Sequence, residues 1–355
     1  MQNEKAVLNL NSAAWRNLAR YGETKGSEGQ RRGLFVRRKV IAPLLSLCGR
    51  MQQGLFREQV QALSSDAAAD RPVVITGHWR SGTTHLHTLL SLDPQFTFPT
   101  TASCMNPHAF MLGAGKVAGA AVKRPMDEVM IAGDSPQEDE FALLAMGARS
   151  PYEALLYPRH LADALSLADP DDLSEPERRA WQETFLFFTR ATSLLGGKRP
   201  VVLKSPTHTG RVGTIAALLP QARFVMIRRN PQEVFESTFR MWRSMFDLYA
   251  LGPPLADDGL RQVILDNRVV MERKFAAAAA RLPAGRLAYV DYERLVADPL
   301  PELHALYQTL GLDSSFLHTQ ALADKLERDR SYTARRALPP ADWQRRVEKV
   351  WTEFF

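Results

Sequence analysis

Short apolar runs alternate along this chain with segments whose apolar residues recur at helical spacing, a pattern typical of α/β proteins. Residues 73–75 are Val, Val and Ile, and Leu86, Leu89 and Leu90 follow at helical spacing. Further apolar runs at residues 200–203, 223–227 and 286–290 are also followed by segments with helical character. The pattern predicts an α/β fold, with a P-loop-like parallel sheet flanked by helices.

The loop after the first run carries the most informative residues. Gly77 and Gly82 bracket a tight turn between the predicted strand and helix. A strand, a glycine loop and a helix present backbone N–H groups and the positive end of the helix dipole to an anion. A loop for ATP or GTP has lysine after the second glycine, whereas this chain has Thr83 there and a cation, Arg80, inside the loop. The loop therefore predicts a site for a 5′-phosphate.

Basic residues also follow the second and third apolar runs. Lys204 ends the second, and Arg228 and Arg229 end the third. A metal-dependent nucleotide hydrolase would usually have an aspartate there to hold magnesium, so the arginines predict a second phosphate site and no metal. Asn230 is a good helix N-cap, and Glu233 predicts a capping box with it.

Together these residues resemble the sulfotransferase family that uses 3′-phosphoadenosine 5′-phosphosulfate (PAPS). The resemblance spans roughly residues 70–320 and is best to the bacterial type with a Pro-x-Glu segment, here Pro136-Gln137-Glu138. It implies PAPS as the sulfuryl donor, transferred in line without a metal. It also implies roles for individual residues: Arg80, Ser81, Gly82, Thr83 and Thr84 as the 5′-phosphosulfate loop, Arg229 and Ser237 as the 3′-phosphate pair, Lys204 at the sulfuryl group, and Tyr292 near the nucleotide.

The acceptor must lose a proton, so a general base is expected within hydrogen-bond reach. Relatives in the resembled family use either His or Glu. His208, four residues after Lys204, is the first hypothesis, and Glu138 is the alternative. Glu140 and His108 are less favoured.

The spacing of the runs indicates how the chain is organised. Residues 97–195 separate the first two predicted strands and are too many for a simple crossover. We expect a helical insertion there that forms a wall of the acceptor pocket. The whole chain, 1–355, is expected to be a single domain, with residues 1–70 as a basic helical N-terminal segment. The C-terminal part is also basic, with Arg328, Arg330, Arg335 and Arg336.

Net charge and composition limit the kinds of binding partner that are expected. The net charge of +6 agrees with an anionic donor. Basic residues are not interleaved with aromatic ones and zinc spacing is absent from the sequence, so no nucleic-acid partner is expected. Basic residues at 31–39 precede the apolar segment 40–47, which is either a helix packed on the core or a patch that touches a membrane surface. Two cysteines, Cys48 and Cys104, and an N-terminus without an apolar signal core favour a cytoplasmic location.

Two other function classes compete with sulfuryl transfer. A P-loop kinase or nucleotide hydrolase is disfavoured by Thr83 at the lysine position. A non-enzymatic nucleotide-binding scaffold would not need cations at Arg80, Lys204 and Arg229, yet all three are present. The acceptor is left open between a hydroxyl and an amine, on a small molecule or a lipid-like one. The oligomeric state is also left open.

Overall fold

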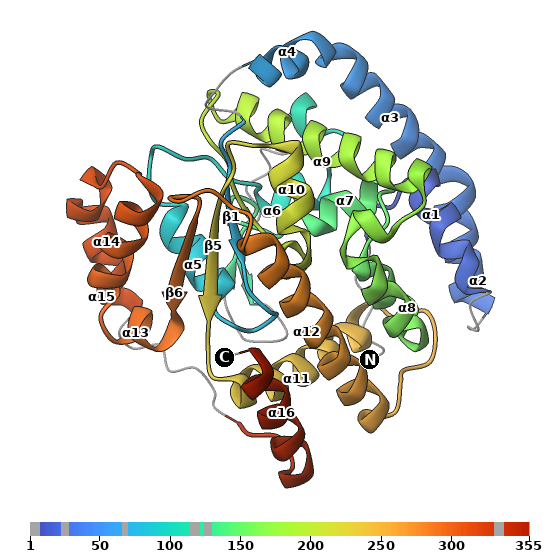
Figure 1. Cartoon of the computed structure of the whole chain (residues 1–355). Helices are drawn as coiled ribbons and strands as arrows, with labels where there is room; N and C mark the ends of the chain where they lie inside the picture. Colours follow the sequence, from blue (N-terminus) through green and yellow to red (C-terminus); the bar gives the residue numbers. More distant parts are fainter. Residues whose placement is uncertain are drawn as a thin grey trace.

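The computed structural model describes residues 8–22, 28–65, 70–113, 121–123, 130–329 and 337–354. Its centre is a four-stranded sheet of order β4-β1-β5-β6 in which every strand pair is parallel (Figure 1). The strands are β1 (Val73–Thr76), β4 (Val202–Lys204), β5 (Arg223–Arg228) and β6 (Leu287–Asp291). The predicted fold class is confirmed, and each strand lies within two residues of its predicted start.

Successive residues of β1 point to opposite faces of the sheet, as in any strand. Val73 and Ile75 pack into one apolar core, and Val74 packs into the other. Because both faces of the sheet are covered, the first three residues of β1 are all apolar and do not alternate with polar residues. The first core is closed by α5 (Thr83–Leu90), α13 (Tyr292–Ala297), α14 (Pro299–Leu310) and α15 (Gln320–Asp329). The second is closed by α7 (Glu140–Met146), α9 (Glu175–Leu195), α10 (Val212–Leu218) and α12 (Asp257–Ala279).

The segment between β1 and β4 is mostly helical, which confirms the predicted insertion. It includes α6 (Thr101–Met105), α7, the 3-10 turn η6 (Pro151–Leu155), α8 (Leu161–Leu165) and α9. It also contains a short antiparallel pair that the pattern did not predict, β2 (Val122–Lys123) with β3 (Met130–Ile131). A parallel bridge between Thr97 and Val201 joins the start of the insertion to the strand at its end.

The N-terminal segment forms helices that follow the outside of the insertion (Figure 1). They are α1 (Ser12–Leu18), α2 (Glu28–Val36), the π-helical turn η2 (Arg37–Ile41), α3 (Ala42–Leu55) and α4 (Arg57–Ala62). No helix in the described part of the chain is both long enough and apolar enough to span a bilayer.

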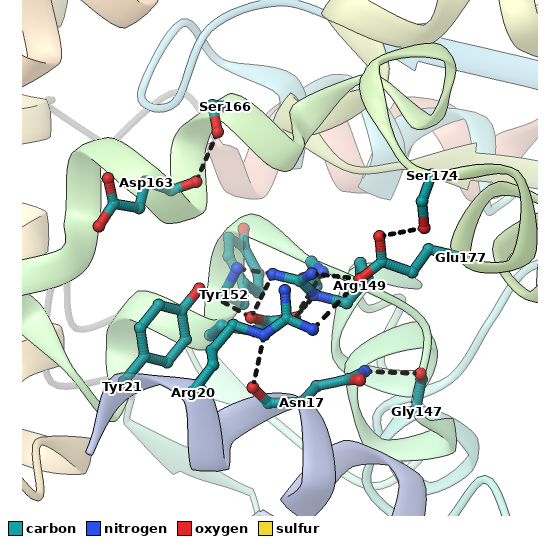
Figure 2. A network of polar contacts seen from close by, with 12 residues as sticks. Asn17, Arg20, Tyr21, Gly147, Arg149, Tyr152, Asp163, Ser166, Ser174 and Glu177 are labelled. Carbon is teal, nitrogen blue, oxygen red and sulfur yellow. Dashed lines mark hydrogen bonds and ion pairs between the residues drawn. The ribbon is translucent and has the colours of Figure 1, made fainter.

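A polar network fixes α1 to the insertion (Figure 2). Arg149 donates to Glu153 at 2.8 Å and to Glu177 at 2.6 Å. From the end of the N-terminal helix, Tyr21 donates to Glu153 at 2.8 Å and Arg20 donates to Glu177 at 3.2 Å. Because Arg149 and Glu153 are almost fully buried, these charge-assisted bonds hold the N-terminal segment firmly in place.

Helix α11 (Pro231–Tyr249) follows β5 and packs against the C-terminal helix α16 (Ala341–Phe354). Asn230 caps α11, because its side chain accepts from the backbone N–H groups of Gln232 and Glu233. The predicted capping box is wrong. The Glu233 carboxylate pairs with Arg229 at 2.8 Å, and the Asn230 backbone N–H donates to Glu293 instead.

Candidate active site

The carboxyl ends of the four parallel strands lie at one edge of the sheet, where ligands of such folds bind. Each end carries a residue that the sequence singled out. The loop after β1 holds Arg80, β4 ends at Lys204, Arg229 follows β5, and Tyr292 follows β6. The fold therefore gathers these side chains from positions more than 200 residues apart in the sequence.

The loop at residues 77–82, which we call the donor loop because the resemblance assigns it to the sulfuryl donor, is held in a tight turn by its own bonds and by its neighbours. Ser81 Oγ donates to the carbonyl of His78 at 2.8 Å, so its hydroxyl stabilises the loop from inside. The Gly77 N–H donates to Thr209 at 2.8 Å, and Thr238 donates to the carbonyl of Trp79 at 3.0 Å. The loop is thus preformed at the start of α5, whose first amides have no partners within the helix.

Two glycines in this loop are required by its geometry. Gly82 has φ +102°, and a Cβ there would lie 2.2 Å from Cδ2 of Tyr292. Gly77 has φ +143°, and a Cβ there would lie 2.6 Å from Ser81 Oγ and 2.9 Å from the carbonyl of Ile227. Arg80 itself adopts φ +70°, which is uncommon for a residue with a side chain. The loop therefore places the Arg80 side chain at some conformational cost.

Five predicted donor-binding residues form one continuous set of contacts. Arg80 Nε donates to Ser237 Oγ at 3.1 Å. The guanidinium of Arg229 donates to the carbonyl of Arg80 at 3.2 Å, and it lies 4.4 Å from the ring centroid of Tyr292. Tyr292 in turn packs against Gly82. The structure brings together residues from the loop, from α11 and from the positions directly after β5 and β6 that were predicted separately.

A second cluster joins the donor loop to the insertion. Lys204 Nζ lies 2.7 Å from Glu138 Oε1 and donates to Thr84 Oγ1 at 3.4 Å. The other carboxylate oxygen of Glu138 accepts a short hydrogen bond from Tyr152, whose hydroxyl accepts from Trp79 Nε1 at 3.1 Å. Burial, followed by the charge of Glu138, raises the pKa of Tyr152 well above its ordinary value, so this phenol stays a donor. The side chain of Glu138 is 15% exposed, and that of Lys204 is 2% exposed.

His208 lies in a different environment. Its Nε2 atom is 2.8 Å from Asp139 Oδ2, and Ser205 donates to the other oxygen of Asp139 at 2.9 Å. Burial alone would raise the pKa of Asp139, but the charge and hydrogen bonds of His208 and the bond from Ser205 hold this pKa below its ordinary value. The side chain of His208 is 0% exposed, and Phe185 contacts its ring edge-on. His208 is thus enclosed with an ionised partner, without an open path to a substrate.

Glu140 is also fully buried, in an ion pair with Arg211. It accepts from Ser150 at 2.5 Å and from Thr207 at 2.7 Å. Burial would raise the pKa of Glu140, but Arg211 and these bonds keep this pKa below its ordinary value. All its oxygen atoms are used within the protein, which is the environment of a structural carboxylate.

The other predicted residues lie away from this edge or outside the described chain. His108 is buried beside α3, where its Nε2 contacts the carbonyl of Asn9 at 2.9 Å. Arg330, Arg335 and Arg336 lie outside the described residues. In the described part of the chain, no group of three or more His, Cys, Asp or Glu side chains is arranged to hold a metal ion.

Sequence reasoning missed Tyr152, Trp79 and Asp139. Tyr152 comes from η6 in the insertion, and Trp79 is one residue before Arg80. Asp139 stands between the two acidic residues that were considered, yet it is the partner of His208. The only signal in the sequence was a set of three consecutive acidic residues, 138–140, and a set of three basic residues at 204, 208 and 211. Such a pattern does not indicate which charges pair.

Comparison with known proteins agrees with this geometry. The model of the sulfotransferase family matches residues 72–315 of the chain. The chain belongs to the sulfotransferase family. It is 30% identical over 312 residues to omega-hydroxy-beta-dihydromenaquinone-9 sulfotransferase Stf3 of Mycobacterium bovis, covering 87% of this chain and 79% of that protein. Stf3 of Mycobacterium tuberculosis matches with the same figures.

Two solved sulfotransferases share the fold. STF1 from Mycobacterium tuberculosis superposes with a TM-score of 0.66 at 22% identity, over 97% of this chain and 92% of that one. STF9 from Mycobacterium avium superposes with a TM-score of 0.63 at 18% identity, over 99% of this chain and 97% of that one. At these identities the likeness concerns the fold alone. The protein is a transferase of the sulfotransferase class, and the kinase or hydrolase alternative is set aside.

Proposed function

We propose that this sulfotransferase transfers the sulfuryl group of PAPS to a hydroxyl of a lipid-like acceptor, with Glu138 as the general base. One observation carries the proposal: Lys204 contacts both Thr84 at the donor loop and the carboxylate of Glu138. A cation suited to a leaving phosphate and a base suited to an acceptor hydroxyl therefore adjoin the same anion-binding loop.

The donor is expected to lie along the carboxyl edge of the sheet. The amides at the start of α5 and the Arg80 side chain are suited to the 5′-phosphosulfate. Arg229 and Ser237, both in contact with Arg80, are suited to the 3′-phosphate. Arg229 is also held in place by its ion pair with Glu233 and by the ring of Tyr292.

In the transfer, the acceptor oxygen bonds to sulfur as the bond from sulfur to the 5′-phosphate oxygen breaks. The acceptor proton passes to Glu138, and the negative charge that develops on the departing phosphate is stabilised by Lys204 and Arg80. The products are a sulfate ester, 3′,5′-ADP and a proton that Glu138 later releases. Tyr152 holds one oxygen of Glu138, which leaves the carboxylate oriented when Lys204 turns to the donor.

Burial distinguishes the candidate bases. The side chain of Glu138 retains some exposure at the strand edge, whereas His208 is fully enclosed with Asp139. We therefore favour Glu138 over His208, the reverse of the order that the sequence favoured. His208 and Asp139 instead hold the segment that carries Glu138 against β4.

A lipid-like acceptor is supported by two features. Stf3, the relative at 30% identity, is named for an omega-hydroxylated dihydromenaquinone. In this chain, aromatic side chains back the Glu138–Tyr152 pair: Phe141 lies 5.1 Å and Trp242 lies 6.4 Å from the ring of Tyr152, between centroids. Phe141 belongs to α7 in the insertion, which would form a wall of the acceptor pocket, and Trp242 belongs to α11, which packs against η6 of the insertion. A cytoplasmic location and a bacterial origin stay predictions.

Sulfation assays with labelled PAPS and a series of acceptors test the proposal. The series pairs hydroxylated prenyl quinols and long-chain alcohols with phenols and amines of low molecular weight. Product mass identifies the acceptor class. We expect Glu138→Gln to lower kcat by about 10²–10⁴-fold while 3′,5′-ADP binds as before, and Lys204→Ala to act mainly on kcat.

The matched control is Glu183→Gln, on the exposed side of α9, which should leave kcat unchanged. His208→Asn should lower stability more than it lowers the kcat of the protein that stays folded. If Glu138→Gln kept near-full kcat while His208→Asn lost much of it at unchanged stability, His208 would be the preferred general base. Activity only on small phenols or amines would refute the lipid-like acceptor.

A further inference from the structure

The outer face of the N-terminal helices carries a row of exposed apolar side chains. Residues at intervals of three or four lie along one face of a helix. The members are each between 46% and 62% exposed, whereas apolar residues at such spacing usually face a core. We call them the apolar row: Val36, Val40, Leu44, Leu47, Met51 and Leu55.

The same helices are strongly basic. Residues 29–57 contain seven Lys and Arg and no Asp or Glu. Lys39 and Arg50, eleven residues apart, come to the same side of the helix after three turns, and both are exposed beside the apolar row. Lys39 and Arg50 form what we call the basic edge, which carries positive charge without nearby carboxylates on its own helix.

The basic edge also borders open space. Arg50 and Arg16 line a cavity of about 430 Å³ between α1 and α3. Its other lining groups include the polar side chains of Ser12, Ser46 and Gln53. Arg50 is thus available to an anion approaching from outside.

We propose that the face formed by the apolar row and the basic edge docks on the surface of an anionic lipid bilayer. A helix with an apolar face and flanking Lys and Arg lies in the membrane interface, with the apolar face at the boundary of headgroups and acyl chains. Phosphate headgroups would meet Lys39 and Arg50 at the same depth. Contiguous exposed apolar side chains mark interaction sites in soluble proteins.

Charge favours a bilayer over a second copy of the chain. A two-fold contact through this face would bring the same basic helices together. Like charges facing each other across an interface are unfavourable, and residues 29–57 offer no carboxylate to offset them. An anionic surface is complementary to both the apolar and the charged parts.

The rest of the fold supports docking as a rigid unit. Helix α3 follows the outer edge of the molecule, with α1 on its inner side (Figure 1). The network of Arg20, Tyr21 and Arg149 ties α1 to the insertion (Figure 2). Docking would therefore place the insertion, on which α1 packs, next to the membrane surface. This inference rests on the surface alone and does not depend on the proposed acceptor.

Vesicle flotation of the full chain without PAPS tests the inference. One set of vesicles contains phosphatidylcholine alone. The other contains phosphatidylcholine and the anionic lipid phosphatidylglycerol in a ratio of about 2:1. We expect binding to the anionic vesicles, weakened by 1 M salt because screening shortens from about 10 Å at 0.1 M to about 3 Å. Lys39→Gln with Arg50→Gln should weaken partitioning roughly fivefold for each cation removed. Val40→Ser with Leu44→Ser and Met51→Ser should weaken it by at least about tenfold.

Matched controls remove the same kinds of exposed side chain elsewhere. They are Lys198→Gln with Arg281→Gln, and Leu195→Ser with Leu300→Ser and Leu338→Ser. These should bind like the original chain, and all variants should bind 3′,5′-ADP equally. Equal binding to neutral and anionic vesicles, or unchanged binding in the charge variant, would overturn the proposal. So would light scattering that shows a dimer which the apolar-row variant alone converts to a monomer. Failure of sulfation with normal flotation would count only against the proposed function.

Discussion

Replacing Gly82 with alanine tests the geometry of the donor loop. A Cβ at this position would lie 2.2 Å from Cδ2 and 2.7 Å from Cε2 of Tyr292. The ring cannot simply retreat, because Arg229 lies over it at 4.4 Å and Tyr292 is 9% exposed. The φ of +102° adds strain for any residue with a side chain. Both effects should destabilise the folded protein and distort the loop.

The two contributions have separable magnitudes. The left-handed conformation costs roughly 1–2 kcal/mol, and overpacking against a rigid neighbour costs about 1–3 kcal/mol. Gly113→Ala is the matched control, because Gly113 has the same φ of +102° in the left-handed region but no atom within 4 Å of the added Cβ. It should show the strain alone. The difference in the free energy of unfolding between the two variants therefore measures the contact with Tyr292.

Urea unfolding at constant m-value gives these free energies, and calorimetry with 3′,5′-ADP reports the loop. We expect Gly82→Ala to lose more stability than Gly113→Ala and, unlike it, to bind the nucleotide more weakly. A double-mutant cycle with Tyr292→Ala should show a coupling of about 1–3 kcal/mol, since removing the ring relieves the overlap. Equal losses in the two glycine variants, with no coupling, would refute the proposed packing of loop and ring.

Other predictions address the buried charges and the donor. Arg211→Met should cost about 3–5 kcal/mol in urea unfolding because it leaves Glu140 buried without its cation, whereas pairing it with Glu140→Gln should recover part of the loss. The folded-state pKa values of Asp139 and Glu140 are depressed. Their contribution to stability is therefore complete above about pH 5 and is lost as the pH falls through the depressed values. A thermal midpoint that rises on acidification from about pH 5 to about pH 3 would contradict this. Arg229→Ala should weaken 3′,5′-ADP binding by about 10–100-fold but leave 5′-AMP binding unchanged, and equal losses for both nucleotides in calorimetry would remove its link to the 3′-phosphate.

Local patterns were sufficient to predict the sheet and the tight loop after β1. A short apolar strand followed by a loop with two glycines leaves few folds open, and parallel strands necessarily bring their carboxyl ends to one edge. The contacts among Arg80, Arg229 and Tyr292 follow from that rule, because Arg229 and Tyr292 come directly after strands and Arg80 lies in the loop after β1. The capping box failed because Arg229 lies four residues before Glu233 and because Glu293, distant in sequence, accepts from the Asn230 N–H. Glu233 had an arginine within reach, and a charge-assisted bond to it outcompetes a bond to a neutral amide.

The pairing of charges in the insertion could not be predicted in the same way. The segment that ends at Glu140 meets η10 (Pro206–Arg211) and the end of β4 across more than 60 residues of sequence, and periodicity says nothing about such a contact. Tyr152 lies in a 3-10 turn without a motif, so its bond to Glu138 had no sequence signal.

The three consecutive acidic residues differ because α7 begins among them. Asp139 is the N-cap and Glu140 is the first residue of the helix, and both turn into the buried side, where His208 and Arg211 balance their charges. Glu138 lies one residue before the cap, outside the helix, and extends toward Lys204 at the edge of the sheet. Two carboxylates thus stabilise the junction between insertion and sheet, and their fixed positions determine where the third lies. A general base needs this arrangement, because its carboxylate must be held in place and still be reached by a substrate. Of the three acidic side chains, only that of Glu138 combines an orienting hydrogen bond with exposure at the donor loop.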